Sequence, residues 1–162
     1  MPTLNPGHLK EVIRIINDCP FFKHMSLEVT EIGVGYSVVA GEIRKNHMNP
    51  FGGLHGGVYA SAIDTAAYWA AYCDLPEKDG LVSLDIKVDF IAPVIDGKIL
   101  VKGKSIKAGK TIHLTEAGIF DANAKLLAHG TSKLLVTHNR QSINDAAQYM
   151  GSRKLPEKFI ES

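Results

Sequence analysis

The chain has 162 residues, of which 45% are hydrophobic, so it is long and apolar enough for one domain with a real core. Its 18 basic and 17 acidic residues nearly balance without a basic cluster, which argues against nucleic acid as a partner. The two cysteines, Cys19 and Cys73, lie far apart and lack metal-like spacing. We interpret both as reduced core thiols. The N-terminal residues do not resemble a signal peptide, so we expect a soluble, cytoplasmic protein.

The first elements are predicted to be a helix and a pair of strands. Asn5 followed by Pro6 is a good helix N-cap with proline at the first helical position, and the apolar spacing predicts an amphipathic helix ending near Cys19. Two runs rich in β-branched residues follow at 26–32 and 36–43. The glycines between these runs favour a hairpin turn.

The central stretch begins with a loop rich in proline and glycine at residues 49–53. From about Gly56 a run of Ala, Ile, Val, Tyr and Trp predicts a long helix that is apolar on nearly every face, and such a helix is normally buried. Its length approaches that of a membrane span, but the glycine loop and Asp64 favour burial in protein. Asp64 is the only carboxylate between Lys45 and Asp74, and an ionised group in an apolar setting is costly unless it is paired. Asp64 is therefore a candidate for a functional site.

The second half of the chain is predicted to consist mainly of strands. Beyond Pro76 apolar residues recur at every second position, which indicates a half-buried strand with Val82, Leu84, Ile86, Val88 and Phe90 on one face. Runs at 98–107, 111–121 and 125–137, joined by short turns, predict an antiparallel meander.

A short C-terminal helix is predicted after Ser142, which forms a capping box with Asp145. We expect residues 1–140 to form a single domain that includes the N-terminal helix, and residues 141–162 to form a peripheral helix and a frayed polar tail. The order of elements predicts an α+β fold in which an antiparallel sheet of five or six strands covers one long helix.

The segment from His47 to Asp64 resembles the signature of the hotdog-fold acyl-CoA thioesterases, specifically the PaaI-like group of the 4-hydroxybenzoyl-CoA thioesterase superfamily. The matching residues are Asn49, Gly52, Leu54, His55, Gly56, Gly57 and Asp64. The strand at 82–93 and the turn at 107–111 are also similar, so the likeness covers roughly residues 20–137. It implies a hotdog fold, hydrolysis of acyl-CoA without a cofactor other than the substrate's coenzyme A, and assembly as a homodimer or a homotetramer.

The resemblance also implies roles for individual residues. The Gly56 amide would donate to the oxyanion, and Asp64 would be the nucleophile or the base that activates water. Asn49 would orient water or the helix start, His55 would hold the loop, and Ser83 matches a position where some relatives use a hydroxyl near the water. The substrate-binding positions implied are Gly57, Thr65, Tyr68, Gly109, Lys110 and Thr111.

Helix geometry predicts that Gly56 and Asp64 act from different subunits. Eight residues of helix separate them, a rise of about 12 Å. Both groups must lie roughly 3 Å from one reacting carbon, which one chain can hardly achieve. A symmetric dimer would place the helix start of one chain beside Asp64 of the other.

Structural explanations remain open beside these roles. Asp64 could pair with a buried cation, Asn49 could be a turn residue before proline, and the glycines could permit close packing. His55 fits loop fixing better than base catalysis. Tyr59, Trp69 and Tyr72 would suit an aromatic or medium-chain acyl group if they line the pocket, although core packing is their ordinary use.

Two other functions also remain open. One is a hotdog hydratase or dehydratase of acyl thioesters, and the other is a non-catalytic acyl-CoA-binding or regulatory module. The histidines show no metal-ligand spacing, and we predict no metal site.

Overall fold

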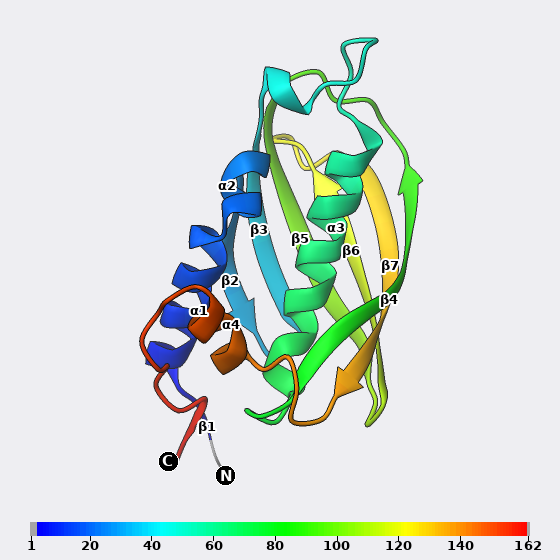
Figure 1. Ribbon diagram of the computed structural model, residues 1–162. Coiled ribbons are helices and arrows are strands. Elements are labelled where there is room, and N and C mark those ends of the chain that lie inside the picture. Colours follow the sequence, from blue (N-terminus) through cyan, green and yellow to red (C-terminus); the bar gives the residue numbers. More distant parts are fainter. Residues whose placement is uncertain (1–2, 162) are drawn as a thin grey trace.

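The computed structural model describes residues 3–161, and its centre is one helix enclosed by a curved sheet (Figure 1). The helices are α1 (Pro6–Asp18), α2 (Pro20–Met25), α3 (Gly56–Ala71) and α4 (Ile143–Tyr149), with short 3₁₀ turns at Lys45–His47 and Tyr72–Asp74. The strands of the main sheet are β2 (Leu27–Gly33), β3 (Tyr36–Ile43), β4 (Gly80–Phe90), β5 (Gly97–Ala108), β6 (Ile112–Phe120) and β7 (Leu126–Thr137). The two remaining strands are β1 (Thr3–Leu4) and β8 (Phe159–Ile160).

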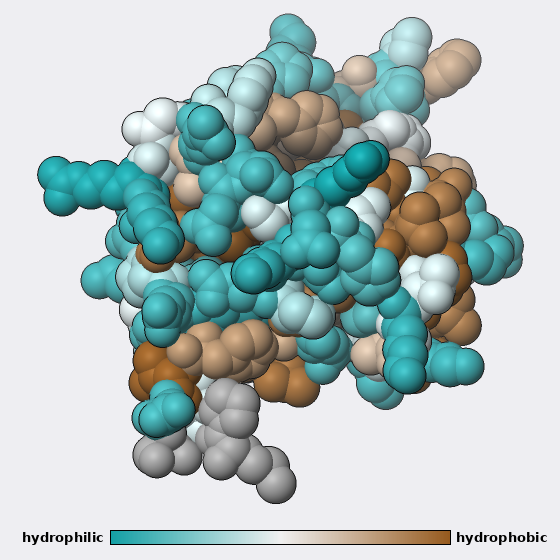
Figure 2. Space-filling model, turned by 60° about the horizontal axis from the view of Figure 1, so that its bottom comes forward, coloured by the Kyte–Doolittle hydropathy of each residue, from teal (hydrophilic) through white to brown (hydrophobic). Residues whose placement is uncertain are grey.

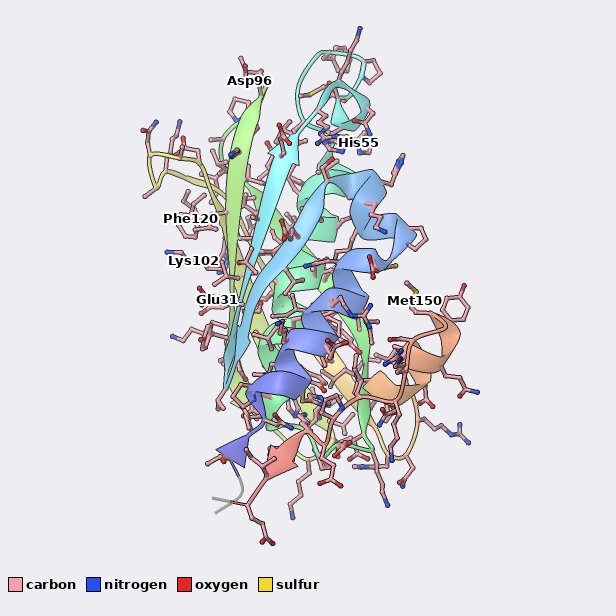
Figure 3. All side chains as sticks on the ribbon, turned by 90° about the vertical axis from the view of Figure 1, so that its left-hand side faces the viewer. Glu31, His55, Asp96, Lys102, Phe120 and Met150 are labelled. Carbon is pink, nitrogen blue, oxygen red and sulfur yellow. The ribbon has the colours of Figure 1, made fainter. Side chains whose placement is uncertain are left out.

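The six strands of the main sheet lie in the order β2-β3-β5-β6-β7-β4, and all neighbours are antiparallel. The inner face of the sheet packs on α3, while α1 and α2 pack against β2. Figure 3 shows Lys102 and Phe120 on the outer side of the sheet and Met150, just after α4, on the opposite side of the molecule. The α+β fold with one long helix against an antiparallel sheet is confirmed.

The local sequence signals place most elements correctly. The Asn5 side chain accepts a hydrogen bond from Gly7 N–H at 2.9 Å, as expected of an N-cap. The hairpin of β2 with β3 and the meander of β5, β6 and β7 are also confirmed. The sequence signals did not predict α2, which starts with Pro20 at its first position directly after α1 ends.

The predicted alternation along β4 is wrong at its beginning. Ser83 pairs with Leu134 and Asp85 with Lys133, so Leu84 is an extra residue that forms a β-bulge. An extra residue exchanges the two faces of a strand. Leu81 and Ser83 therefore face α3 before the bulge, and Val88 and Phe90 face it afterwards. Val82, between Leu81 and Ser83, points to the other side of the sheet.

The helix α3 is not buried on all sides in the single chain. Its buried residues include Ala62, Ile63, Ala66 and Ala67, all of them 0% exposed. A stripe of more accessible residues follows the helical repeat along one side, and its members are Gly57, Ala60, Ser61, Asp64 and Tyr68. None of the helices within residues 3–161 has the length and hydrophobicity needed to cross a membrane.

The accessible stripe of α3 lies beside the free edge of the sheet. Strand β4 is the last strand and pairs on one side only, with β7. Its side chains Leu84, Ile86 and Phe90 are 54%, 38% and 60% exposed. In Figure 2 apolar side chains gather at the right-hand margin, the side on which Figure 1 places β4 and β7. This edge of the molecule therefore combines unpaired backbone groups with apolar surface.

The C-terminal segment is ordered rather than frayed, which corrects the sequence-based expectation. The capping box of Ser142 with Asp145 begins α4 as predicted. Beyond α4, strand β8 pairs with β1, and Lys158 is 0% exposed. The Lys158 Nζ donates to the carbonyl oxygens of Tyr72 and Leu75 at 2.6 and 2.7 Å. These carbonyls follow the end of α3, where backbone acceptors lack partners and attract a cation.

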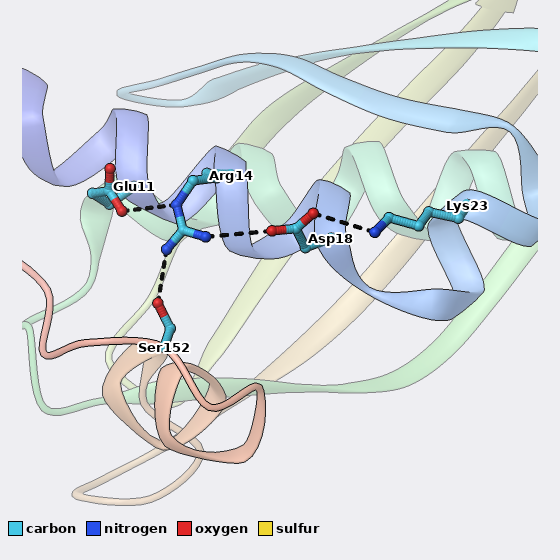
Figure 4. A network of polar contacts seen from close by, with 5 residues as sticks. All are labelled: Glu11, Arg14, Asp18, Lys23 and Ser152. Carbon is cyan, nitrogen blue, oxygen red and sulfur yellow. Dashed lines mark hydrogen bonds and ion pairs between the residues drawn. The ribbon is translucent and has the colours of Figure 1, made fainter.

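Polar contacts also join this segment to α1 (Figure 4). Arg14 Nη2 donates to Ser152 Oγ at 2.7 Å. The same guanidinium contacts Glu11 and Asp18 at 2.9 and 3.3 Å, and Asp18 contacts Lys23. Exposed ion pairs of this kind add little stability, so the contact with Ser152 matters mainly for position.

Candidate active site

The loop before α3 is held by its own side chains. Asn49 Oδ1 accepts hydrogen bonds from the backbone N–H groups of Phe51 and Gly53 at 2.9 and 3.2 Å. Gly52 adopts a φ of 81°, a conformation that favours glycine. Asn49 therefore acts as a turn residue, which is the structural explanation that the sequence left open.

His55 caps the helix that follows. It is the N-cap residue of α3, and its Nδ1 accepts a hydrogen bond from Gly57 N–H at 2.9 Å. Since an accepting Nδ1 carries no proton, this bond requires the tautomer with the proton on Nε2. In the structure His55 is placed to fix the helix start. Figure 3 shows His55 at the loop end of the molecule.

Gly56 is the first residue of α3, and its amide is a free donor. Within residues 3–161 no backbone or side-chain acceptor takes the Gly56 N–H. The amide lies at the positive end of the helix dipole. A hollow of about 400 Å³ opens beside it, lined by Leu54, Tyr59, Phe90 and Ile91. A β-carbon added at Gly56 would lie 3.4 Å from the Phe90 ring, an ordinary van der Waals contact, so close packing alone does not require glycine at this position.

Asp64 lies two turns further along α3 with its carboxylate toward β4. Ser83 Oγ donates a hydrogen bond to Asp64 Oδ1 at 2.9 Å, so the structure brings these two predicted residues together. No Arg, Lys or His nitrogen within residues 3–161 forms an ion pair with Asp64. The structural alternative of a buried cation partner therefore finds no support, and the carboxylate is available at the surface of two grooves.

The helix keeps Gly56 and Asp64 apart within one chain. The α3 helix is continuous from Gly56 to Ala71, so eight residues of rise separate the two groups by about 12 Å. The hollow at Gly56 and the grooves at Asp64 have no lining residue in common. The single chain thus carries both parts of the expected site without joining them.

The implied substrate-binding residues fall into three places. Gly57 lies at the helix start, and Thr65 and Tyr68 line a groove together with Asp64. Tyr68 donates to the Leu81 carbonyl at 3.2 Å, and burial raises its pKa to about 12, so it stays protonated at neutral pH. The turn at 109–111 lies elsewhere, and Gly109 and Lys110 border a hollow of about 410 Å³ with Asp74 and Asp79.

The groove at Asp64 also contains residues that the sequence analysis did not select. They include Phe22 from α2 and Ser142, Asp145, Ala146 and Tyr149 from the C-terminal segment. No local pattern marks them, because their role depends on where α4 packs. Within residues 3–161 no group of three or more His, Cys, Asp or Glu side chains is placed to hold a metal ion.

Comparisons with known proteins agree with this architecture. The family model described as thioesterase superfamily matches residues 51–128. A protein from Saccharolobus solfataricus that is named as an esterase is 31% identical over 107 residues. These residues span 65% of this chain and 74% of that protein. Human acyl-coenzyme A thioesterase 13 is 28% identical over 126 residues, which span 75% of this chain and 89% of that protein.

A solved structure is similar over most of its length. The crystal structure of a thioesterase from Haemophilus influenzae superposes with a TM-score of 0.76 at 25% identity, covering 87% of this chain and 98% of that one. The expected hotdog fold is thereby confirmed. This chain belongs to the thioesterase superfamily and is a thioester hydrolase.

Proposed function

We propose that this protein hydrolyses acyl-CoA to a free acid and coenzyme A at a site shared by two protomers. Asp64 of one protomer is the nucleophile or general base, and the Gly56 amide of the other stabilises the oxyanion. The observation that carries the proposal is the unpaired Asp64 carboxylate, oriented by Ser83, on a helix whose first amide is free. The acyl-CoA substrate is supported by the name of the human relative.

The free edge of β4 supports the shared site. An unpaired edge with exposed apolar side chains is a ready template for a second strand. Antiparallel pairing of two β4 strands brings the Ser83 end of one beside the Phe90 end of the other. Ser83 binds Asp64, and Phe90 lies against Gly56. Such a dimer therefore carries Asp64 toward the helix start of its partner, twice by symmetry.

The proposed chemistry has two routes that use the same geometry. In the first, an Asp64 oxygen attacks the thioester carbon, the C–S bond breaks, CoA thiolate leaves, and water hydrolyses the resulting anhydride. In the second, Asp64 takes a proton from water as that water attacks the same carbon, and the C–S bond then breaks, releasing the free acid and CoA thiolate. In both routes negative charge develops on the carbonyl oxygen, and the Gly56 N–H at the positive end of α3 stabilises it. Ser83 keeps the carboxylate in position.

The first test is release of free thiol from a panel of aryl, short-, medium- and long-chain acyl-CoAs. Asp64→Asn keeps the size of the side chain and an acceptor for Ser83, but it removes the charge. We expect kcat/KM to fall at least about a hundredfold while the oligomeric state and the unfolding midpoint stay unchanged. Wild-type protein that binds acyl-CoA without hydrolysing any thioester would refute the proposal and favour the binding-module alternative. Addition or loss of water across an acyl double bond would favour the hydratase alternative.

A second test addresses the sharing of the site. Gly56→Pro removes the amide hydrogen at a helix position that accepts proline, and His55 before it is extended, with φ −66° and ψ 138°. Gly56→Ala keeps the amide and serves as the matched control. We expect Gly56→Pro and Asp64→Asn each to be inactive alone. Exchanging subunits between them creates heterodimers with one intact site, so about a quarter of wild-type activity returns. Heterodimers without activity would show that the two residues act within one chain.

Three further features belong to the same proposal. We expect the dimer to be the catalytic unit and a homotetramer to be the assembled form. The mechanism uses no cofactor beyond the coenzyme A of the substrate. Cys19 and Cys73 are both free thiols, which supports a cytoplasmic location.

A further inference from the structure

A groove of about 460 Å³ extends from Asp64 between α3 and α4. Helix α3 contributes Thr65, Tyr68 and Trp69 to its wall, and α4 contributes Ala146 and Tyr149. The accessible lining is mostly apolar, and the volume lies within the range of about 300–1,000 Å³ found for pockets that hold small ligands. The helix α4 lies beyond residue 128, where the match to the family model ends.

We propose that this groove holds the acyl group of the substrate and that α4 is the wall that determines which acyl groups fit. The inference rests on the proposed role of Asp64. The reacting thioester carbon must lie roughly 3 Å from the Asp64 carboxylate. The acyl group is attached directly to that carbon, so it must leave the reacting centre through space next to Asp64, and the groove supplies such space.

The lining specifies a neutral, apolar acyl group. Trp69 packs edge to face against Tyr68 and Tyr72, with ring centroids 5.1 and 5.4 Å apart, and these rings offer flat surfaces to an aryl ring or an alkyl chain. The charged side chains at the groove are Asp64, Asp79 and Asp145, and none of the lining residues within 3–161 is Lys or Arg. A carboxylate on the acyl group would therefore meet only like charge. We infer aryl or medium-chain acyl groups as substrates and exclude dicarboxylic ones.

The α4 wall is fixed in place by core packing and by its N-terminal cap. Ile143 and Ala147 are buried in the core, 6% and 2% exposed, while Ser142 and Asp145 cap the helix. The contact of Arg14 with Ser152 holds the chain directly after α4 (Figure 4). Ala146 then presents a small side chain to the groove, and Tyr149, which is 90% exposed, stands one turn further along. The small residue leaves the space that a larger one would fill.

The test changes the wall and measures chain-length preference. Ala146→Phe fills the groove, and Gln148→Phe adds the same ring at an exposed position of α4 that does not line it. We expect the ratio of kcat/KM for octanoyl-CoA to that for acetyl-CoA to fall at least about tenfold in Ala146→Phe, mainly through KM, and to stay at the wild-type value in Gln148→Phe. Tyr149→Ala changes an exposed side chain that makes no core contact, so it keeps the test available if Ala146→Phe does not fold. We expect this variant to raise KM for octanoyl-CoA and benzoyl-CoA.

Trp69 provides a direct reading of occupancy, because it is the only tryptophan of the chain. Octanoyl-CoA added to Asp64→Asn should shift the Trp69 emission, and succinyl-CoA should not. The inference would be overturned, with thioester hydrolysis left intact, by an unchanged octanoyl-to-acetyl ratio of kcat/KM in Ala146→Phe together with an unchanged KM for octanoyl-CoA in Tyr149→Ala. Hydrolysis of succinyl-CoA as fast as of octanoyl-CoA would overturn it as well. A Trp69 shift with octanoyl-CoA, in a wild-type protein inactive on every thioester, would refute the proposed function and support the groove.

Discussion

Replacing Lys158 should change how stability depends on pH. Lys158 is 0% exposed, and its Nζ donates to two carbonyl oxygens and lies 4.0 Å from the centroid of the Tyr72 ring. Within residues 3–161 no carboxylate forms an ion pair with it. Burial disfavours the ammonium form and lowers the pKa of Lys158 from 10.5 to about 8.

The sign of the effect follows from proton linkage. Between about pH 8 and pH 10.5 the unfolded chain binds a proton at Lys158 that the folded chain has released. The free energy of unfolding therefore rises with pH across this window. Below the window both states hold the proton, and the folded state carries the full cost of the buried charge. The shift of the pKa from 10.5 to about 8 corresponds to about 3 kcal/mol over the whole window, and to about 2 kcal/mol between pH 7 and pH 9.5.

Lys158→Met keeps the length of the side chain and removes the titrating group. Urea unfolding at one protein concentration gives the free energies for wild type and variant at pH 7 and about pH 9.5. We expect the free energy of unfolding of wild type, relative to that of the variant, to be about 2 kcal/mol higher at pH 9.5 than at pH 7. Tyr68, whose pKa burial raises, titrates in both proteins and cancels. Lys154→Met, at an exposed position, is the control. The reasoning would be refuted if the difference in free energy of unfolding between wild type and Lys158→Met changed with pH no more than the difference for this control.

Two further predictions concern the sheet. Ile86→Glu places like charges on the free edges of both β4 strands, so it should give a folded, inactive monomer, and a dimer on size-exclusion chromatography would contradict the proposed interface. Gly103→Ala would put a β-carbon 2.1 Å from the Ala66 carbonyl oxygen on α3, which should cost about 1–3 kcal/mol of unfolding free energy in urea. An unchanged urea midpoint for Gly103→Ala would show that β5 can move away from α3 without loss.

Local signals in the sequence were enough for most of the elements and for part of the site. The Asn5 cap, the Ser142 capping box and the short turns of the meander each act within a few residues, so their patterns predicted the structure correctly. The family resemblance supplied His55, which lies at the start of α3, and its role in the site stays a prediction. The pairing of Asp64 with Ser83 joins two segments, and the family resemblance supplied both residues as site candidates.

What the sequence did not predict depends on contacts between distant residues. Nothing near Lys158 indicates that its side chain reaches the carbonyls of Tyr72 and Leu75 beyond the end of α3, since an exposed lysine is the ordinary case. The position of β4 beside β7, rather than beside its sequence neighbour β5, also depends on the whole sheet. The wall of the groove follows from the packing of α4, and its residues Ala146 and Tyr149 carry no pattern of their own.

The extra residue, Leu84, links the geometry of the site to the geometry of the proposed subunit contact. Ser83 before the bulge and Phe90 after it both face α3 only because the extra residue shifts the alternation of side chains along β4 by one position. An engineer who regularises β4 by deleting Leu84 must choose which half of the strand keeps its orientation, since the other half rotates outward. A graft of this active site onto another hotdog scaffold therefore has to include the irregular strand as well as the helix.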